Sequence, residues 1–285
     1  MEHGRVIVVA TPIGNLEDLS PRAARVMAEA DVIAAEDTRR TRTLLDHIGA
    51  RVPMVSHHEH NEKWRVPQLI ARAQSGETIV VVSDAGLPGL ADPGFRLVRA
   101  AIEAGVPVEA IPGPAAALQA LVLSGLPMDR FVFEGFLPRR DYTRRQRVTE
   151  LRQEARTMIF YISPHRAAEE LEDLAAIFGP ERPAALAREL TKLHEEVWRG
   201  TLTELAGRAL DGVRGEVTLV VSGALPPDPA EYSDERLREM VAAHMAHGLS
   251  RKEAAARVAT DTGATKKRVY DASLPVESDD EDDTD

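Results

Sequence analysis

Carboxylate and imidazole side chains stand just beyond the ends of several predicted strands. Glu36 and Asp37 follow a Val-Ile-Ala-Ala run. His58 and His60 follow the next apolar run, and Glu189 follows another in the second half of the chain. A carboxylate or a neutral imidazole within hydrogen-bond reach of a hydroxyl group accepts its proton, typically accelerating a reaction about 10²–10⁴-fold. These residue types at these positions predict general-base chemistry.

Each of these groups also has a structural interpretation. Asp37 is placed to cap a helix that begins near Thr38, because an Asp side chain accepts hydrogen bonds from the free amides of a first turn. Glu189 and Lys192 lie three positions apart, a spacing at which they form an ion pair on a helical turn. The cluster His57–His60 has the side chains of a metal site, although we favour hydrogen bonding to RNA or in a cleft, or a place in a surface loop.

Three loops of small residues accompany these groups in the first half of the chain. Each follows a run of β-branched residues, and the loops are Thr11–Asn15, Ser83–Gly86 and Pro112–Ala116. Such runs are typical of buried parallel strands, and open α/β sheets bind ligands beyond the carboxyl ends of their strands. Gly, Ala and Pro there let the backbone approach a ligand closely. The loops therefore predict a binding site.

The first of these loops excludes two common ligand fingerprints. A dinucleotide-binding turn has the pattern Gly-x-Gly-x-x-Gly, whereas Thr11–Leu16 contains a single glycine. The Gly-Lys-Ser/Thr of a phosphate-binding P-loop is also absent from it. The residues alone thus indicate a small organic ligand held by backbone and small side chains, without identifying it.

Strands and helices alternate along the chain, which predicts an α/β protein with parallel βαβ units in its first domain, 1–113. The strands expected there are 6–10, 32–35, 52–55, 78–82 and 107–111. A second α/β domain is expected at 114–224, with strands at 157–161, 183–187, 195–199 and 216–222. Ser20-Pro21 and Ser163-Pro164 have the composition of helix starts, because Ser caps and Pro fits the first turn.

The C-terminal part, 232–274, has the pattern of short helices. Ser250 and Thr265 are expected N-caps, and Lys266-Lys267-Arg268 lies early in the last helix. The segment resembles a helix-turn-helix that contacts nucleic acid; a helical dimerisation or packing appendage is the alternative. The acidic segment 275–285 is expected to be a disordered tail.

Composition limits the class of protein. The chain has 285 residues, 44% of them hydrophobic, with no cysteine and a net charge of −11. Residues 277–285 contribute seven acids, so the remainder carries only −4. The segments Glu134–Arg147 and Leu249–Ser273 are rich in basic residues, and either suits phosphate contact or a solvated face. Without a signal-peptide pattern or an apolar run near the roughly 20 residues of a membrane span, a cytoplasmic protein is expected.

Several motifs in order carry a resemblance to a known family. The strings are Thr11–Asp18, Ala34–Arg39, His58–Glu62, Val82–Gly86, Asp92–Gly94, Pro112–Pro114 and Ala187–Lys192. They resemble the tetrapyrrole methylase superfamily, and within it the branch of 16S rRNA (cytidine-2′-O-)-methyltransferases. The resemblance runs from about Val6 to Leu274. Two positions depart from the family pattern, because Leu87 stands where Thr is usual and Ile162 where Glu is usual.

The resemblance implies a homodimeric methyltransferase of two α/β domains with S-adenosylmethionine in the cleft between them and no metal. Its substrate would be a cytidine ribose in the decoding region of 16S rRNA, free or in the small ribosomal subunit. RNA contact by the C-terminal helices is then favoured. The catalytic candidates are Asp37, Glu36, His58 and Glu189. The expected cofactor-binding residues are Pro12, Ile13, Gly14, Ser83, Asp84, Ala85, Gly86, Ala115, Ala116 and Ala187.

The expected RNA contacts are basic side chains, because a guanidinium fork matches phosphate oxygens. They are Arg39, Arg139, Arg140, Arg144, Arg188, Lys266 and Lys267.

Two alternative functions stay open. A methyltransferase acting on a corrin or sirohaem precursor would share the fold, although this chain lacks the Gly-x-Gly-Pro-Gly-Asp loop associated with those enzymes. A non-catalytic RNA-binding assembly factor would use the basic segments without the three loops.

Overall fold

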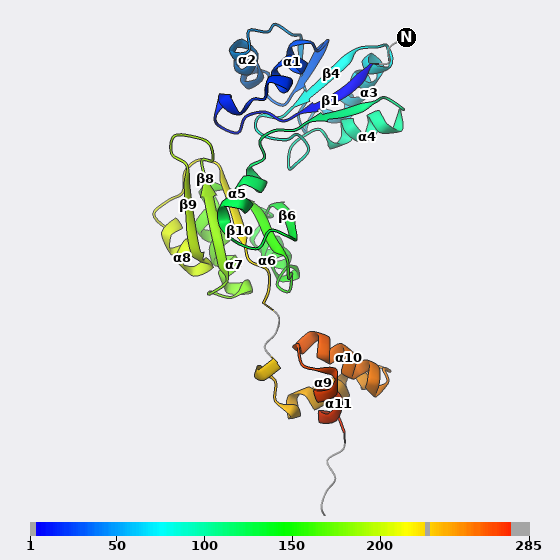
Figure 1. Ribbon diagram of the computed structural model, residues 1–285, viewed down its shortest axis with the longest axis vertical. Coiled ribbons are helices and arrows are strands. Elements are labelled where there is room, and N and C mark those ends of the chain that lie inside the picture. Colours follow the sequence, from blue (N-terminus) through cyan, green and yellow to red (C-terminus); the bar gives the residue numbers. More distant parts are fainter. Residues whose placement is uncertain (1–3, 226–228, 275–285) are drawn as a thin grey trace, which may run out of the picture. The chain divides into compact units, whose positions relative to one another are not determined.

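The computed structural model describes residues 4–225 and 229–274. Its contacts divide the chain into two compact units, which we call unit 1 (Met1–Gly223) and unit 2 (Ala224–Asp285). Among the described residues, unit 1 contains two five-stranded sheets and unit 2 contains three α-helices (Figure 1). Within the described ranges, no helix combines the length and the apolar character needed to cross a membrane.

The first sheet of unit 1 is parallel throughout, with the strand order β3-β2-β4-β1-β5. Its strands are β1 (Arg5–Val9), β2 (Val32–Ala35), β3 (Met54–Ser56), β4 (Thr78–Val82) and β5 (Val108–Ile111). Each expected strand is found here within two residues at either end. Because all five strands run the same way, the segments that follow them emerge at one edge of the sheet.

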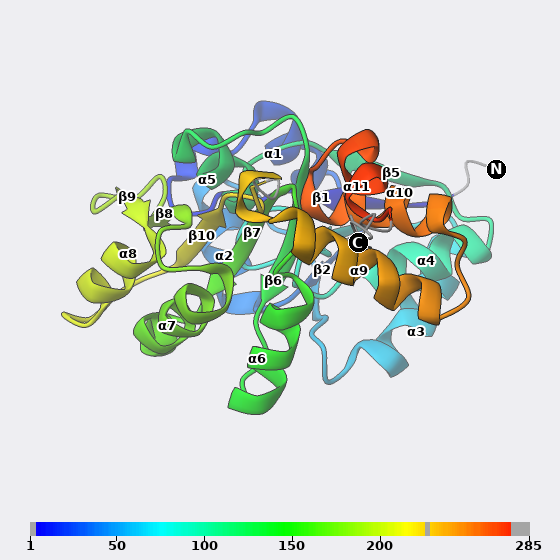
Figure 2. The ribbon, with the colours of Figure 1, turned by 90° about the horizontal axis from the view of Figure 1, so that it is seen from below.

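Helices cover both faces of this sheet. α1 (Pro21–Ala28) and α2 (Thr38–His47) pack on one face, where their side chains meet Ile7, Val80 and their neighbours. α3 (Glu62–Gln74) and α4 (Phe95–Glu103) pack on the other face, against Val6 and Ile79. The helices α3 and α4 lie side by side (Figures 1 and 2). Adjacent strand residues thus point to opposite faces, as the two-residue period of a strand requires.

The second sheet is mixed, with the order β6-β7-β10-β8-β9. Its strands are β6 (Phe131–Phe136), β7 (Thr157–Ile162), β8 (Pro183–Arg188), β9 (Glu196–Thr201) and β10 (Val217–Val221). Only β6 and β7 are parallel neighbours, whereas β10 is antiparallel to both β7 and β8. The expected α/β pattern is therefore present, but its strands do not all end at the same edge.

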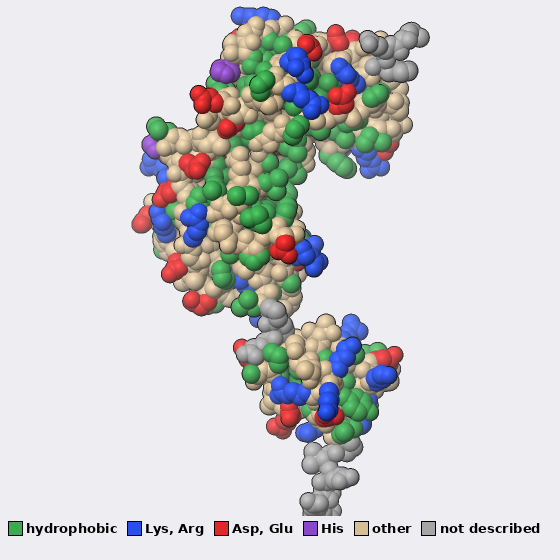
Figure 3. All heavy atoms as spheres, in the orientation of Figure 1, with side chains coloured by type: hydrophobic (Ala, Val, Ile, Leu, Met, Phe, Trp, Pro, Cys, Tyr) green, Lys and Arg blue, Asp and Glu red, His purple; other side chains and the backbone are tan. Residues whose placement is uncertain are grey.

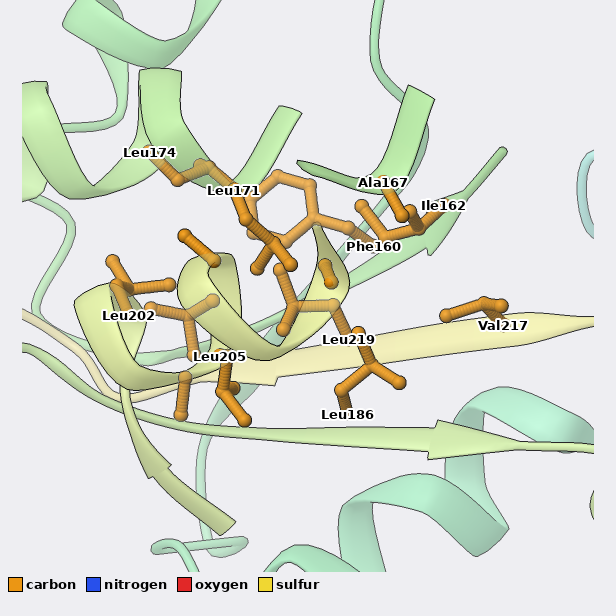
Figure 4. Close-up of a cluster of buried hydrophobic side chains, with 14 of the residues drawn as sticks. Phe160, Ile162, Ala167, Leu171, Leu174, Leu186, Leu202, Leu205, Val217 and Leu219 are labelled. Carbon is orange, nitrogen blue, oxygen red and sulfur yellow. The ribbon is translucent and has the colours of Figure 1, made fainter. Parts of the chain in front are cut away.

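The two faces of the second sheet are covered differently. α6 (Asp141–Glu150), α7 (Ala167–Phe178) and α8 (Leu202–Ala209) pack on one face, around Phe160, Leu186 and Leu219 (Figure 4). α5 (Ala116–Ser124) packs on the other face. Ile13, from the loop after β1, belongs to that second cluster, so the first loop of the first sheet is anchored on the second sheet.

Capping residues set several helix starts in unit 1. Ser20 accepts a hydrogen bond from the Ala23 amide at the start of α1, as expected. Ser163, by contrast, makes no capping hydrogen bond; it precedes the short 3-10 turn η2 (Pro164–Arg166), after which α7 begins. The remaining short 3-10 turns are η1 (Leu16–Asp18) and η3 (Pro229–Glu231).

Unit 2 is a cluster of three helices around its own core. They are α9 (Asp234–Ala246), α10 (Arg251–Thr262) and α11 (Lys266–Ala272). Ser250 and Thr265 cap α10 and α11, which confirms both expected N-caps. Lys and Arg side chains gather on the face of unit 2 seen in Figure 3. The acidic segment 275–285 lies outside the described residues.

Candidate active site

A cavity of about 380 Å³ lies where loops of the first sheet meet the second sheet. From the first half of the chain it is lined by Ile13, Ala85, Gly86, Leu87, Leu90, Asp92, Ala115 and Ala116. From the second half it is lined by Phe136, Tyr161, Ile162, Pro164, Gly215, Glu216, Val217 and Thr218. All three small-residue loops therefore contribute to one site, as their positions after parallel strands predict.

Hydrogen bonds join two of these loops to each other. The Thr11 amide donates to the Gly86 carbonyl at 2.9 Å, and the Gly86 amide donates to the Thr11 carbonyl at 3.1 Å. The Thr11 hydroxyl also donates to the Ser83 carbonyl. Gly86 has a φ of 79°, a conformation that is strained for residues with a side chain. A glycine at this position therefore allows the backbone both to pair with Thr11 and to form part of the cavity wall.

The structure separates the ten expected cofactor-binding residues into three groups. Those that line the cavity are Ile13, Ala85, Gly86, Ala115 and Ala116. Those in shallower hollows of the same loops are Pro12, Gly14, Ser83 and Asp84. Ala187 does not line the cavity, because its side chain is buried beside α5 in the apolar cluster that contains Ile13.

Glu36 and Asp84 lock the ends of β2 and β4 together. The Asp84 amide donates to the Glu36 carboxylate at 3.1 Å, and the Asp37 amide donates to the Asp84 carboxylate at 3.0 Å. Arg40 adds an ion pair with Asp84 at 3.5 Å. Both carboxylates are thus held in place by backbone amides next to the cavity.

Asp37 has the geometry of the capping alternative. Its carboxylate accepts a hydrogen bond from the Arg39 amide at 2.8 Å and pairs with the Arg39 guanidinium at 2.7 Å. These hydrogen bonds to Arg39 lower the pKa of Asp37 to about 2. A carboxylate with so low a pKa is a weak proton acceptor. Arg39 is itself mostly exposed beyond this pair.

The histidines form a turn that does not line the cavity. The His58 amide donates to the side-chain oxygen of Asn61, whose side-chain nitrogen lies 3.2 Å from His58 Nε2. His57 is buried next to Glu62, with 3.7 Å between His57 Nε2 and a Glu62 carboxylate oxygen. Across residues 4–225 and 229–274, no His, Asp and Glu side chains are grouped in a way that could hold a metal ion.

Glu189 holds the segment that brings Glu216 to the cavity. Its carboxylate accepts from the Glu216 amide at 3.0 Å and pairs with Lys192 at 2.8 Å. The bond to Lys192 is the main reason why the pKa of Glu189 is lowered. Lys192 also pairs with Glu216 at 3.2 Å. The expected ion pair is present, although Glu189 has a φ of 51° and lies in a turn.

The expected RNA contacts differ in their availability. Arg139, Arg140, Lys266 and Lys267 are exposed. Arg188 is mostly covered and pairs with Glu196 at 2.9 Å. A phosphate can therefore reach the four exposed side chains freely and Arg188 only in part.

Arg144 requires a correction. Its side chain is fully buried and pairs with Asp141, Glu169 and Asp173. The arginine-rich composition of this segment predicted a phosphate contact, but Arg144 lies on the buried face of α6, against α7. It therefore holds the two helices together and presents no surface to RNA.

Asp92, like Glu216, is an acidic residue of the site for which the sequence predicted no role. It lines the cavity, and burial is the largest of the effects that raise its pKa to about 7, followed by the charges of Glu36, Asp84 and Glu216. Strongly perturbed carboxyls in a cleft are typical of functional sites. The one available signal was its place in the Asp92-Pro93-Gly94 string that follows the second small-residue loop.

Comparisons with known proteins place the chain in a family. The family model described as Tetrapyrrole (Corrin/Porphyrin) Methylases matches residues 5–206. A Synechocystis protein named ribosomal RNA small subunit methyltransferase I is 46% identical over 277 residues, which cover 97% of this chain and 99% of that protein. A protein of the same name from Mycobacterium bovis is 48% identical, with 96% of each chain covered.

A solved structure shares the fold. It is the uroporphyrin-III C-methyl transferase of Thermus thermophilus complexed with S-adenyl homocysteine, with a TM-score of 0.54 and 22% identity, covering 77% of this chain and 97% of that one. At this identity the likeness shows the fold alone. The family model and the nearly full-length relatives show more: this chain belongs to the tetrapyrrole (corrin/porphyrin) methylase family, and within it to the group of proteins named ribosomal RNA small subunit methyltransferase I.

Proposed function

We propose that this protein transfers a methyl group from S-adenosylmethionine to the 2′-hydroxyl of a cytidine ribose in the decoding region of 16S rRNA. The observation that carries the proposal is the cavity lined by Asp92, in a chain that matches the rRNA methyltransferases named above over nearly its full length. We also propose a cytoplasmic homodimer whose partner is 16S rRNA or the small ribosomal subunit.

The cavity suits S-adenosylmethionine in size and lining. Its volume of about 380 Å³ lies within the range of roughly 300–1,000 Å³ typical of small-ligand sites. Gly86, Ala115 and Ala116 leave backbone groups accessible, and Phe136 and Tyr161 provide aromatic faces with ring centroids 5.4 Å apart. A flat heterocycle packs well against such faces.

The charge of the site favours a cationic ligand. Glu36, Asp84 and Glu216 lie close enough to Asp92 for their charges to raise its pKa. Bound S-adenosylmethionine would supply an electrophilic methyl group on a positively charged sulfur. Acidic side chains attract this sulfonium and the ligand's ammonium group, whereas they repel phosphates. The acidic cleft thus supports the sulfonium as its ligand and the basic residues outside it as RNA contacts.

Asp92 is the general base that we propose. A ribose hydroxyl is a poor nucleophile while it carries its proton, and a carboxyl with a pKa of about 7 accepts that proton efficiently near neutral pH. Glu36 is the second candidate, although its carboxylate is engaged by the Asp84 amide. The cavity walls would align the hydroxyl with the methyl group, which is the main requirement of an in-line displacement.

Two exposed basic groups of residues are proposed to bind the RNA backbone. Arg139 and Arg140 precede α6, and Lys266 and Lys267 open α11. Phosphate contacts of this kind position an RNA without reading its sequence. We therefore propose that these residues contribute affinity for RNA and that the cavity selects the nucleotide to be methylated.

The decisive experiment is mass mapping of 2′-O-methylation on 16S rRNA from cells with and without this protein. The proposal predicts one cytidine methylation that disappears with the protein and returns with the wild-type chain. An unchanged methylation map contradicts it. Labelled methyl groups found instead in a tetrapyrrole would support the corrin or sirohaem-precursor alternative, which shares the fold.

The assembly-factor alternative is tested by calorimetric titration with S-adenosylmethionine. Binding with one site per chain supports an enzyme. No detectable heat, together with unaltered RNA binding, would favour the non-catalytic role.

A further inference from the structure

A buried carboxylate outside the cavity is tied to the loop that carries Asp92. Glu62 begins α3, and its side chain is only 8% exposed. Its neighbour His57 is 1% exposed, and neither ring nitrogen of His57 has a hydrogen-bond partner among residues 4–225 and 229–274. A buried charge is costly unless it is paired, so the contacts of Glu62 are expected to matter.

Glu62 makes its contacts with the start of α4. The Gly94 amide donates to one Glu62 oxygen at 3.3 Å, and the Arg96 guanidinium lies 3.2 Å from the other. Gly94 is the N-cap of α4 and has no side chain to satisfy the free amides there. A carboxylate at a helix N-terminus is also stabilised by the helix dipole. Glu62 thus acts as a cap supplied by a neighbouring helix.

The segment that ends at Gly94 forms one wall of the cavity. It runs from β4 to α4 and contributes Ala85, Gly86, Leu87, Leu90 and Asp92 to the lining. Its first part is fixed by the hydrogen bonds between Thr11 and Gly86. Its last part contains backbone that glycine tolerates best, because Ala91 has a φ of 66° and Gly94 a φ of 137°. Such conformations persist only where surrounding contacts hold them.

We propose that Glu62 is a positioning residue for methyl transfer, which fixes the wall segment 87–94 through Gly94 and Arg96 and so holds the Asp92 carboxyl in the cavity. This inference rests on the proposed function of Asp92 as the base. Glu62 itself does not line the cavity, so its effect passes through the backbone two residues beyond Asp92.

The first test measures the wall segment directly, without substrate. In Glu62→Ala, amide hydrogen exchange across 87–94 should accelerate at least tenfold, whereas Glu62→Gln, which keeps an oxygen for the Gly94 amide, should change it less than threefold. Glu103→Ala is the matched control. It removes an exposed ion pair between Glu103 and Arg99, both on α4, and should leave hydrogen exchange in the segment unchanged. Unaltered exchange in Glu62→Ala overturns the inference.

The second test separates positioning from loss of stability. Glu62→Ala should lower kcat at least tenfold with little change in the KM for RNA, and Glu62→Gln should restore most of it. The acidic limb of the pH–rate profile should also move below pH 7, because a released Asp92 is better hydrated and its pKa falls. A merely destabilised enzyme would lose active molecules without moving that limb. If Glu62→Ala does not fold, Arg96→Ala takes its place in both tests.

A double-mutant cycle distinguishes this inference from the function on which it rests. In an Asp92→Asn background, Glu62→Ala should cost no further activity, because the group that it positions is already gone. Full additivity would overturn the role of Glu62 and leave Asp92 as the base. If Asp92→Asn alone retains wild-type activity, the proposed base is wrong, whatever Glu62 does.

Discussion

At the residue scale, the environment of each carboxylate decides what it does. Asp37 and Asp92 are the same residue type, yet hydrogen bonds to Arg39 lower the pKa of one to about 2 and burial among other acids raises that of the other to about 7. The first is a fixed anion that caps α2. The second exchanges a proton near neutral pH, which a general base must do.

Asp92→Asn tests this assignment. We expect kcat to fall about 10²–10⁴-fold, because the amide cannot accept the proton, while S-adenosylmethionine still binds. The wild-type kcat/KM, which reports the pKa of the free enzyme, should rise about tenfold per pH unit below about pH 7 and level off above it, as the carboxyl ionises. Methyl transfer at subsaturating substrate across pH 5–9 is the measurement. A wild-type rate that is independent of pH in this range would contradict the role.

Arg144→Leu tests the structural assignment of the buried guanidinium. Within the part of the chain that the structure describes, removing it leaves Asp173, which is 4% exposed, with the outer partner Arg145 alone. Breaking a buried ion pair typically costs about 3–5 kcal/mol, so the free energy of unfolding should fall by that order. Arg140→Leu, at an exposed position in the same segment, should change it by less than about 0.5 kcal/mol. Chemical denaturation gives both values, and equal stabilities would be contrary to our assignment.

At the scale of elements, the parallel order of the first sheet gathers the three loops at one edge. The strands β1, β4 and β5 are neighbours in the order β4-β1-β5, although β4 follows β1 by about 70 residues in sequence. The loops that follow these strands therefore converge, although the sequence does not show that they are in contact. Gly86, which pairs with Thr11, allows the backbone to turn there.

Gly86→Ala tests the dependence of the site on that turn. A side chain in a left-handed conformation costs roughly 1–2 kcal/mol, and relaxation of the loop should also weaken S-adenosylmethionine binding at least tenfold. Gly49→Ala is the control, because Gly49 has a φ of 70° with open space around it and lies at the end of α2. It should lose similar stability and keep full affinity. Calorimetry and thermal unfolding report the two effects separately.

At the scale of the whole molecule, the two units have separate cores. Among the described residues, the apolar cluster of unit 2 is made of its own side chains, including Leu237, Val258 and Val269. The residues named above as lining the cavity all belong to unit 1. Cofactor binding and RNA affinity are therefore expected to be separable.

Deleting residues 232–285 should weaken 16S rRNA binding and leave S-adenosylmethionine affinity unchanged. In the full-length chain, Lys266→Ala with Lys267→Ala should reduce the slope of log affinity against log salt by about 1 to 2, because each phosphate contact releases counterions. Filter binding across salt concentrations measures this slope. RNA affinity that survives both changes would assign the C-terminal helices to packing or dimerisation.

Much of the architecture could be predicted from the sequence. Short β-branched runs, the Ser20 cap of α1 and the Ser250 and Thr265 caps of unit 2 are local signals, because neighbouring residues alone determine them. The same holds for the small-residue loops, five of whose expected residues line the cavity. The motif strings were sufficient to indicate the family.

What only the tertiary structure decided is which charged groups lie together. The pKa of Asp92 depends on its burial and on acids that include Glu36 and Glu216 from other loops, the burial of Arg144 depends on α7, and the contact of Glu62 with Gly94 joins two helices about 20 residues apart along the chain. Burial and electrostatic interactions act through space, between side chains whose positions no local pattern encodes. The sequence by itself therefore determined the elements and the small-residue loops, and the fold determined which carboxyl lies half-buried in the cavity, where we propose it as the base.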